Sequence, residues 1–490
     1  MSKILSFDVG TTAMKCILFD DALKELFYSN REYSINTTAD GRAELDPEVY
    51  FETFLECVKD AKEALGGLSD VSAVTFTTQG ETLIPVDKRG APLCPAIVWL
   101  DTRASSEAEQ IKQKVSPEAM YRATGLCDVD GALPAAKILW LKANEPEIYS
   151  KAHKFLLLED FLIYKLTGRF VSEKSLQSST GWYDIVNERL FDDVAEICGV
   201  LEEKLPEILP CGTVVGRINQ ELCSALGFSH EAVVVTAAMD QISSAVGAGN
   251  IKEGVFTETT GTALVVGVTA EKPVFDIKNP ITVYKHYDGR FMYMPYFPTA
   301  GIALKWFKDT VMPYAKTEGE KLGLSAYGYI DREAERSPVG SGGVIMLPQL
   351  SEYGAFLGLS LATEARDMAR ATLEGIGFML RTIVEKVEQR GIKIERIYSL
   401  GGGSYSSLWC KIKSDICGKE IEAVDYAQTT ALGAAILGFV AIGSYSSVSE
   451  AHLSRSGGGR AFVPNGENRE AYNLAYKKYK NYLNITEGEK

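Results

Sequence analysis

The sequence predicts an α/β protein made of two similar halves. Apolar runs of strand length at 4–7 and 16–19 flank the polar segment Asp8-Val9-Gly10-Thr11-Thr12, which is the pattern of a β-hairpin. A second copy occupies 255–267, with Thr260-Gly261-Thr262 at its turn. Strand and helix patterns alternate after each copy, as in an α/β sheet. Two such hairpins about 250 residues apart indicate halves that face one ligand.

The first half contains four further elements with polar residues at strand ends. They are a helix over about 47–65, a strand over 71–76, a mostly helical region over about 104–166 and a buried strand over 233–238. Asp46 ahead of Pro47 is a typical helix start, and Gly168 after the helical region is a typical helix end. Because α/β sheets place their sites at strand ends, 77–82 and Asp240 are candidate site residues.

The second half repeats the scheme and ends in a polar tail. Its expected elements are strands near 255–268, 343–347 and 394–400 and a long helix over about 363–390, followed by the glycine run 401–403. Gly247, Gly249 and Gly254 fit a hinge between the halves, which predicts domains at 1–248 and 249–490. We expect the last residues, 484–490, to fray.

Composition favours a soluble protein with small-molecule partners. A chain of 490 residues is too long for one core. Its net charge of −14 argues against a nucleic-acid or anionic-membrane partner. The nine cysteines form no CxxC pair and only four histidines are present, which indicates reduced thiols rather than disulfides or a zinc site. Without a signal-peptide pattern or a long apolar run, we expect a cytoplasmic protein.

The polar segment at 8–12 has two interpretations. In an ordinary turn, Asp8 caps its own backbone through an Asx-type bond. The segment also contains a carboxylate, a glycine and two adjacent hydroxyls, which are groups that can bind phosphate and a hydrated metal ion. The second copy of the hairpin favours the nucleotide loop.

One series of motifs runs through the chain. In order, its members are Asp8-Val9-Gly10-Thr11-Thr12, the segment that begins at Gln79, Trp99-Leu100-Asp101-Thr102-Arg103, Asp240-Gln241, Thr260-Gly261-Thr262, Gly401-Gly402-Gly403 and Ala431-Leu432-Gly433-Ala434-Ala435. The series resembles that of the FGGY carbohydrate kinase family, from Lys3 to about Gly443. The resemblance implies an actin-like α/β fold of two ribonuclease H-like domains, with the active-site cleft between them, and ATP and Mg²⁺ as cofactors. The first domain would hold the sugar, the first phosphate loop and the catalytic aspartate, and the second domain would hold the second phosphate loop and adenosine.

The resemblance implies nucleotide contacts in both halves. Asp8 would hold Mg²⁺ through water, and the residues after it would let donors approach the transferred phosphate. The full set is Asp8, Gly10, Thr11, Thr12, Lys15, Gly261, Thr262, Gly301, Lys305, Gly402, Gly403 and Ser407. A glycine in this set can equally serve a tight turn, and Lys305 can lie on a solvated helix face. Gly433 is expected to allow close helix packing rather than to contact ligand.

Asp240 is the expected general base. It follows an apolar strand and precedes Gln241, so its carboxylate can project from the strand end and take the proton of an acceptor hydroxyl. The structural alternative is a helix N-cap, because Asp240 also begins an expected helix over 241–248.

The acceptor contacts implied by the resemblance are Gln79, Gly80, Glu81, Thr82, Asp101, Asp240 and Gln241. Related xylulose kinases carry Gln-Met-His-Gly at 79–82, and glycerol kinases carry Gln-Arg-Glu-Thr. Gly80 replaces that arginine and Ala132 lies near a tyrosine position, which predicts room for an acceptor larger than glycerol. Asp101 can instead serve as a cap that is paired with Arg103. The loop at 350–354 is shorter than the Leu-Ser-Gly-Glu-Arg-Thr-Pro loop of many relatives.

The favoured function is an ATP-dependent kinase that phosphorylates a hydroxyl of a pentulose-type ketose, similar to xylulose kinases. A glycerol or other short-polyol kinase is the alternative within the enzyme class. An actin-like or chaperone-like ATPase without sugar phosphotransfer is the alternative from another class, and it leaves Asp240 and the Gln79 segment unexplained. A sugar-responsive regulator without catalysis is disfavoured because Asp8, Asp240 and both loops are present. The acceptor's identity stays open, and a homodimer is one option for the oligomeric state.

Overall fold

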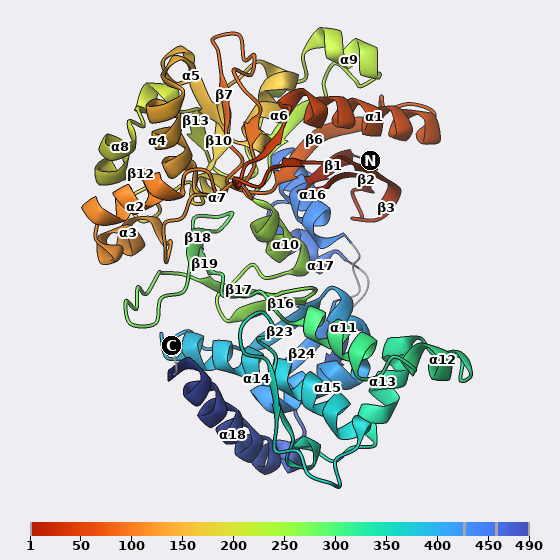
Figure 1. The fold of residues 1–490 in the computed structure, drawn as a ribbon. Helices are drawn as coiled ribbons and strands as arrows, with labels where there is room; N and C mark the ends of the chain where they lie inside the picture. Colours follow the sequence, from red (N-terminus) through yellow and green to blue (C-terminus); the bar gives the residue numbers. More distant parts are fainter. Residues whose placement is uncertain (1, 425–427, 456–458, 489–490) are drawn as a thin grey trace. The chain divides into compact units, whose positions relative to one another are not determined.

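The computed structural model describes residues 2–424, 428–455 and 459–488 (Figure 1). These residues form two compact units. The first unit comprises 2–251, 271–293 and 428–455, and the second comprises 252–270, 294–424 and 459–488. Two segments from the C-terminal half of the sequence therefore belong to the first unit. The functional boundary at 248/249 stays a prediction.

The first unit contains a six-stranded mixed sheet. Its strands, in spatial order, are β14 (Val214–Arg217), β15 (Val233–Thr236), β6 (Val71–Thr78), β1 (Lys3–Val9), β2 (Ala13–Asp20) and β3 (Glu25–Glu32). β1 and β2 are antiparallel, with Asp8 opposite Lys15. This pairing confirms the predicted N-terminal hairpin. β1, β6 and β15 run parallel to one another.

Shorter strands and twelve helices complete the described part of the first unit. The short strands are β4 (Asn36–Thr37), β5 (Ala43–Leu45), β7 (Ile84–Val86), β8 (Ala96–Ile97), β9 (Lys154–Leu156), β10 (Val171–Glu173), β11 (Tyr183–Asp184), β12 (Arg189–Leu190), β13 (Glu207–Leu209), β18 (Val283–Lys285) and β19 (Phe291–Tyr293). The helices are α1 (Pro47–Leu65), α2 (Ser105–Lys114), α3 (Pro117–Thr124), α4 (Pro134–Asn144), α5 (Pro146–Lys151), α6 (Leu158–Thr167), α7 (Lys174–Gln177), α8 (Asp192–Cys198), α9 (Gln220–Leu226), α10 (Asp240–Ala248), α16 (Thr429–Ala441) and α17 (Val448–Leu453). The predicted helical region is thus confirmed, although β9 interrupts it.

Local sequence chemistry explains the start of α1 and its packing on the sheet. The Asp46 carboxylate accepts the Glu48 N–H at 3.0 Å, as expected of an N-cap. Gly66 ends the helix at φ 74°, where glycine avoids the Cβ clash. Phe54 packs on Phe7 of β1 with ring centroids 4.8 Å apart. These contacts bury the apolar side of α1 against the sheet.

Helices α10 and α16 pack backbone to backbone. A Cβ on Gly433 would lie 1.8 Å from the Ser243 oxygen, and a Cβ on Gly247 would lie 1.9 Å from the Thr429 oxygen. The packing role predicted for Gly433 is confirmed. The hinge role predicted for Gly247 is wrong, because this glycine lies inside α10 and admits the neighbouring helix.

The second unit is built around a second hairpin. Its strands are β16 (Val255–Thr260), β17 (Leu264–Ala270), β20 (Tyr296–Phe297), β21 (Ile345–Leu347), β22 (Ala355–Leu357), β23 (Arg396–Leu400), β24 (Glu420–Ala423) and β25 (Arg460–Phe462). β16 is antiparallel to β17 and parallel to β23, which confirms the repeated hairpin. β23 is parallel to β24.

The described part of the second unit also contains six α-helices. They are α11 (Gly301–Thr310), α12 (Ala315–Glu320), α13 (Ala326–Glu335), α14 (Ala365–Glu388), α15 (Ser407–Cys417) and α18 (Arg469–Gly488). Figure 1 shows α14 beside α15. The predicted long helix is confirmed as α14. Residues 484–488 continue α18, and 489–490 lie outside the described residues. The fraying expected for this tail stays a prediction. No helix in the described ranges has the length and apolar character needed to cross a bilayer.

Candidate active site

Three parallel strands of the first unit bring predicted site residues to one edge of the sheet. Asp8 lies in β1, Gln79 directly follows β6, and Asp240 follows β15 as the first residue of α10. Parallel strands have their carboxyl ends at the same edge, where α/β sheets bind ligands. The negative charge of Asp8 also acts on Asp240 and raises its pKa. The two carboxyl groups therefore lie within electrostatic range of each other.

The turn between β1 and β2 presents the first group of predicted phosphate contacts. The Gly10 N–H donates to the Ala13 oxygen at 3.0 Å and closes the turn. Lys15 lies across the hairpin from Asp8, with its Nζ 3.1 Å from Asp8 Oδ2. The Thr11 hydroxyl accepts the Trp99 Nε1–H at 2.9 Å. Thr12 occupies the same turn, so this hairpin gathers a carboxylate, an ammonium group and hydroxyls.

The Asp240 carboxyl group has the environment of a general base. Burial, strengthened by the charge of Asp8 and opposed by the Gln241 N–H, raises the pKa of Asp240 to about 7. Its Oδ1 accepts that N–H at 2.6 Å. The N-cap position belongs to Met239, so the alternative in which Asp240 is the N-cap is wrong. A base whose pKa lies near 7 is suited to proton transfer at neutral pH.

The segment after β6 presents two unusual groups. Gln79 is buried; its Nε2 donates to the Thr82 hydroxyl at 3.2 Å, but its Oε1 has no hydrogen-bond partner among the described residues. Such an atom is rare in proteins and can accept a ligand hydroxyl. Glu81 adopts φ 65°, which is strained for a residue with a Cβ. The Lys137 ammonium donates to the Glu81 backbone oxygen at 2.9 Å and supports this conformation.

The sequence analysis missed two groups near Glu81, the carboxyl group of Asp130 and the phenol of Tyr284. Burial raises the pKa of Glu81 to about 7; the charge of Lys137 opposes the shift, and the charges of Asp130 and Asp240 add to it. Burial and then Glu81 also raise the pKa of Tyr284, with Asp240 and Asp130 contributing. Glu81 therefore lies within electrostatic range of Asp130, Asp240 and Tyr284. No local motif marks Asp130 or Tyr284.

The tertiary structure explains how Tyr284 reaches this region. It lies in β18, within the segment 271–293 that folds with the first unit. The neighbouring Val283 N–H donates to the Gly125 oxygen at 2.9 Å. A Cβ on Gly125, whose φ is +77°, would lie only 2.1 Å from the Val283 oxygen. Glycine at 125 thus permits the close contact that fixes β18.

A pocket of about 580 Å³ in the second unit collects half of the predicted nucleotide residues. Those that line it are Gly261, Thr262, Gly301, Lys305, Gly402 and Gly403. Other lining residues, which the sequence analysis missed, include Tyr327, Asp331, Tyr405, Ser406 and Trp409. The pocket combines aromatic faces with exposed backbone, which suits a flat heterocycle and its attached sugar.

Glycine at 301 is required by the turn between β16 and β17, which is the predicted second phosphate loop. A Cβ there would lie 2.0 Å from the Gly261 oxygen. The Ala300 and Ile302 N–H groups both donate to the Thr262 oxygen at 3.1 Å. The start of α11 is therefore hydrogen-bonded to the turn between β16 and β17 and restricts its conformation.

A buried ion pair stabilises β16 next to the turn between β16 and β17. Lys413 of α15 donates to Glu258 Oε1 at 2.7 Å and to the Thr260 hydroxyl at 2.9 Å. The Thr260 hydroxyl donates in turn to Glu258 Oε2 at 2.6 Å, and Ser399 also donates to this carboxylate. Both charged side chains are 0% exposed. Lys413 lies 155 residues from Glu258, so no local pattern pairs them.

Two family models match nearly the whole chain. The N-terminal domain of the FGGY family of carbohydrate kinases matches residues 3–247, and the C-terminal domain of the same family matches residues 258–442. The chain belongs to the FGGY family. The family resemblance and the fold class expected from the sequence are thereby confirmed, and this FGGY kinase is an ATP-dependent sugar kinase.

Relatives of this FGGY kinase have more than one named activity. A gluconokinase of Bacillus subtilis is 27% identical over 461 residues, which cover 91% of this chain and 89% of the relative. A xylulose kinase of Lactococcus lactis is 28% identical over 515 aligned positions, which cover 99% of this chain and 98% of the relative. The crystal structure of a ligand-bound xylulose kinase from Lactobacillus acidophilus shares the fold with a TM-score of 0.89, at 24% identity and 99% and 98% coverage of the two chains.

Two of the predicted acceptor residues are corrected by the structure. Asp101 is fully buried, and its Oδ2 accepts the Ala43 N–H at 2.6 Å. The Arg103 guanidinium binds both carboxylate oxygens, at 2.9 and 2.6 Å. Both carboxylate oxygens of Asp101 thus accept hydrogen bonds from protein groups. This agrees with the alternative in which Asp101 is paired with Arg103. Gly80 leaves no open space, because a Cβ there would lie 3.0 Å from Ser179 Oγ and 3.1 Å from Met239 Sδ.

Two predicted nucleotide residues also differ from expectation. Ser407 does not line the 580 Å³ pocket; its hydroxyl accepts the Arg460 guanidinium at 2.7 Å. The neighbouring Ser406 lines the pocket and caps α15 by accepting the Trp409 N–H at 3.0 Å. Lys305 lines the pocket, but its ammonium binds Asp309 at 2.8 Å and its side chain is 58% exposed. Its contribution to nucleotide binding stays a prediction.

The first phosphate loop fits the chemistry of Mg²⁺. Within the described ranges, no group of three or more His, Cys, Asp or Glu side chains could hold a metal ion by itself. Mg²⁺ usually keeps several waters and is bound by one or two carboxylates together with substrate phosphates. Asp8, beside the turn that carries Thr11 and Thr12, supplies such a carboxylate.

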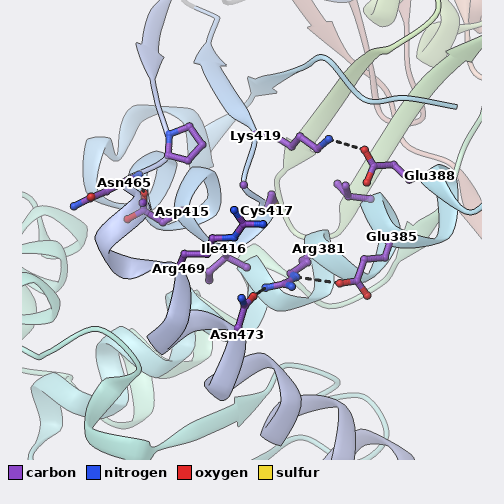
Figure 2. A pocket seen from close by; sticks show the side chains of 14 residues that line it. Arg381, Glu385, Glu388, Asp415, Ile416, Cys417, Lys419, Asn465, Arg469 and Asn473 are labelled. Carbon is purple, nitrogen blue, oxygen red and sulfur yellow. Dashed lines mark hydrogen bonds and ion pairs between the residues drawn. The ribbon is translucent and has the colours of Figure 1, made fainter.

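A second pocket, of about 530 Å³, lies away from the predicted site residues. Figure 2 shows it between side chains of α14, α15 and α18. Arg381 binds Glu385 with an N–O distance of 3.1 Å, and Lys419 binds Glu388 at 2.5 Å. None of the predicted site residues lines this pocket. The positive and negative side chains that line it are equal in number, so their charges largely cancel.

Proposed function

We propose that this FGGY kinase transfers the γ-phosphate of ATP to a hydroxyl of a pentulose-type ketose, with Asp240 as the general base. The observation that carries the proposal is the position of Asp240 at the strand edge beside Asp8, with a pKa raised to about 7. In its charged form this carboxylate can accept the acceptor's proton as the new P–O bond forms. The named xylulose kinase relatives support the ketose assignment.

The acceptor would be held by polar groups of the first unit. Gln79 offers a buried amide oxygen without a partner in the part of the chain that the structure describes, and Glu81 and Tyr284 lie within electrostatic reach of Asp240. Thr82 and Gln241 are further predicted contacts. In their ionised forms, Asp130, Asp240 and Glu81 would repel an acceptor that carries its own carboxylate, and the charge of Lys137 would oppose that repulsion.

ATP would use both phosphate loops. The pocket of the second unit would hold adenosine, with Gly402 and Gly403 against the base and Gly261 and Thr262 at the phosphates. Thr11, Thr12 and Lys15 would donate to the transferred group. Asp8 would hold Mg²⁺ through water, and this ion would supply positive charge at the phosphates.

A glycerol or short-polyol acceptor is the second candidate. Gln79, Glu81 and Thr82 match the glycerol kinase pattern at three of four positions. The space expected beside Gly80 is filled by Ser179 and Met239, so acceptor size cannot be argued from that glycine. The acceptor must therefore be distinguished by turnover.

A coupled ADP-release assay tests the proposal. The acceptors are pentuloses, hexuloses, tetroses, gluconate and glycerol, each at several concentrations. We expect a pentulose to have the highest kcat/KM and gluconate and glycerol to be at least about tenfold poorer, the effect of about 1.4 kcal/mol. A preference for gluconate or glycerol would overturn the substrate assignment. ADP release that no acceptor stimulates would instead favour the ATPase alternative.

Substitution of Asp240 tests the catalytic assignment separately. Asp240→Asn keeps the size of the side chain but removes the base, so kcat should fall at least about 10²-fold. Calorimetry should show that ATP still binds. A near-normal kcat in this variant would contradict the general-base role.

A further inference from the structure

The backbone segment that delivers Asp240 is held by buried side chains from other elements. This segment, 237–239, connects β15 to α10. The Ala237 N–H donates to Glu159 Oε1 at 2.9 Å, and the Met239 N–H donates to the Ser175 hydroxyl at 3.0 Å. Both acceptor side chains are at most 1% exposed.

The carbonyl between these two N–H groups is fixed in the same way. The Ala238 oxygen accepts the Thr77 hydroxyl at 2.7 Å and the Ser243 hydroxyl at 2.9 Å. Both hydroxyls are fully buried. The 237–239 segment is therefore tied to α6, α7, β6 and α10. A buried backbone group that loses its partner is costly, so this set of bonds strongly restricts the segment.

The Ser175 hydroxyl is itself oriented. It donates to Glu173 Oε1 at 2.8 Å, which leaves its oxygen free to accept the Met239 N–H. Glu173 Oε1 also accepts the Leu176 N–H at 2.6 Å, and Glu173 Oε2 accepts the Cys211 thiol at 2.8 Å. Glu173 is fully buried. The carboxylate thus fixes the direction of the serine hydroxyl.

We propose that Glu159 and Ser175 are positioning residues, which act on phosphoryl transfer by fixing the 237–239 segment and thereby the Asp240 carboxylate. The proposal rests on the proposed role of Asp240 as the base. A general base works only within hydrogen-bond reach of the hydroxyl proton. A displacement of about 1 Å can lower the rate about 10²-fold. Small shifts of the segment should therefore change kcat strongly.

Single substitutions test the two contacts. Ser175→Ala removes the acceptor of the Met239 N–H, and kcat should fall about 10- to 100-fold while the KM for ATP changes less than about twofold. Glu159→Leu should act in the same direction. Glu159→Gln keeps an oxygen for the Ala237 N–H and should restore most of the turnover. Ser414→Ala is the matched control: this hydroxyl is equally buried and donates to two backbone oxygens, but it lies in the second unit.

A double-mutant cycle separates positioning from general damage. If Ser175 acts through Asp240, then Ser175→Ala should lower the residual rate of Asp240→Asn by less than about twofold, because coupled residues are not additive. A full additional loss in that background would overturn the proposal. An unchanged kcat in Ser175→Ala would overturn it as well.

The remaining outcomes are also decisive. If Ser175→Ala fails to fold, the cycle is run with Glu159→Leu and with Thr77→Val, which removes the donor to the Ala238 oxygen. Equal turnover in Glu159→Gln and Glu159→Leu would contradict the role of the Ala237 contact. A near-normal kcat in Asp240→Asn alone would reject the proposed base, whereas additivity with a strongly impaired Asp240→Asn would reject only the positioning proposal.

Discussion

The β1–β2 hairpin of the first unit and the β16–β17 hairpin of the second unit share a backbone design. In each, a glycine N–H closes the turn with a 3.0 Å bond, from Gly10 to the Ala13 oxygen and from Gly261 to the Ala263 oxygen. In each, the first strand also pairs with a parallel neighbour. The first turn has four residues between its last paired residues, Val9 and Met14, and the second has three between Thr260 and Leu264.

The two hairpins differ in what they do with charge. Asp8 pairs with Lys15, whose side chain is 38% exposed, so a ligand can compete for both groups. Glu258 pairs with Lys413 in the interior, where neither is exposed. One hairpin keeps its charge available for chemistry, and the other uses charge to support a loop. A shared fold thus does not imply a shared role.

The largest expected effect is at the available carboxylate. Asp8→Asn should lower kcat by about 10³-fold, because charge stabilisation of the transferred phosphate is lost. The free energy of unfolding should change by less than about 1 kcal/mol, since a partly exposed ion pair contributes little. Steady-state kinetics and urea unfolding measure both quantities. A large loss of stability with little loss of turnover would reverse the distinction between the hairpins.

The buried pair should show the opposite behaviour. Lys413→Met leaves the Glu258 charge without its cation, and the free energy of unfolding should fall by roughly 3–5 kcal/mol. The double variant Glu258→Gln/Lys413→Met should recover part of this loss because no isolated charge remains. Urea titration monitors each protein. A loss below about 1 kcal/mol in Lys413→Met would argue against a supporting role for the pair.

A smaller effect is expected where the glycine run meets the buried pair. A Cβ on Gly403 would lie 2.8 Å from Thr260 Cβ and 3.3 Å from Lys413 Nζ. Gly403→Ala should therefore shift the run and raise the KM for ATP about 5- to 10-fold, the effect of about 1–1.4 kcal/mol. Gly466→Ala is the control, because no atom lies within 4 Å of its added Cβ. Equal KM values for the two variants would contradict the prediction.

The smallest effect is a pH dependence that belongs to the first unit. Asp240 must lose its proton to act as a base, and its pKa is raised to about 7. At saturating ATP, kcat/KM for the acceptor should rise with pH and be about fivefold higher at pH 7 than at pH 6. Glu81→Gln should keep this rise with pH, although Glu81 also has a pKa raised to about 7. Loss of the rise in Glu81→Gln would assign it to Glu81 instead.

Local patterns in the sequence were sufficient for much of the framework. Apolar strands around polar turns predicted both hairpins, and Asp46 with Pro47 predicted the start of α1. The position of Asp240 after an apolar strand predicted its place at the sheet edge. These predictions succeeded because hydrogen-bonding periodicity and capping act between residues close in the chain.

The tertiary structure alone decided which distant groups share a site. It placed Tyr284 with Glu81 and paired Lys413 with Glu258. It also paired Asp101 with Arg103 and placed the Ser407 hydroxyl in a hydrogen bond with Arg460. The sequence by itself determined the two-hairpin α/β framework, the FGGY motif series and the strand-end position of Asp240. Contacts between remote elements depend on how whole sheets and helices pack, and they decided which of the predicted polar groups already have protein partners and which can still meet a ligand.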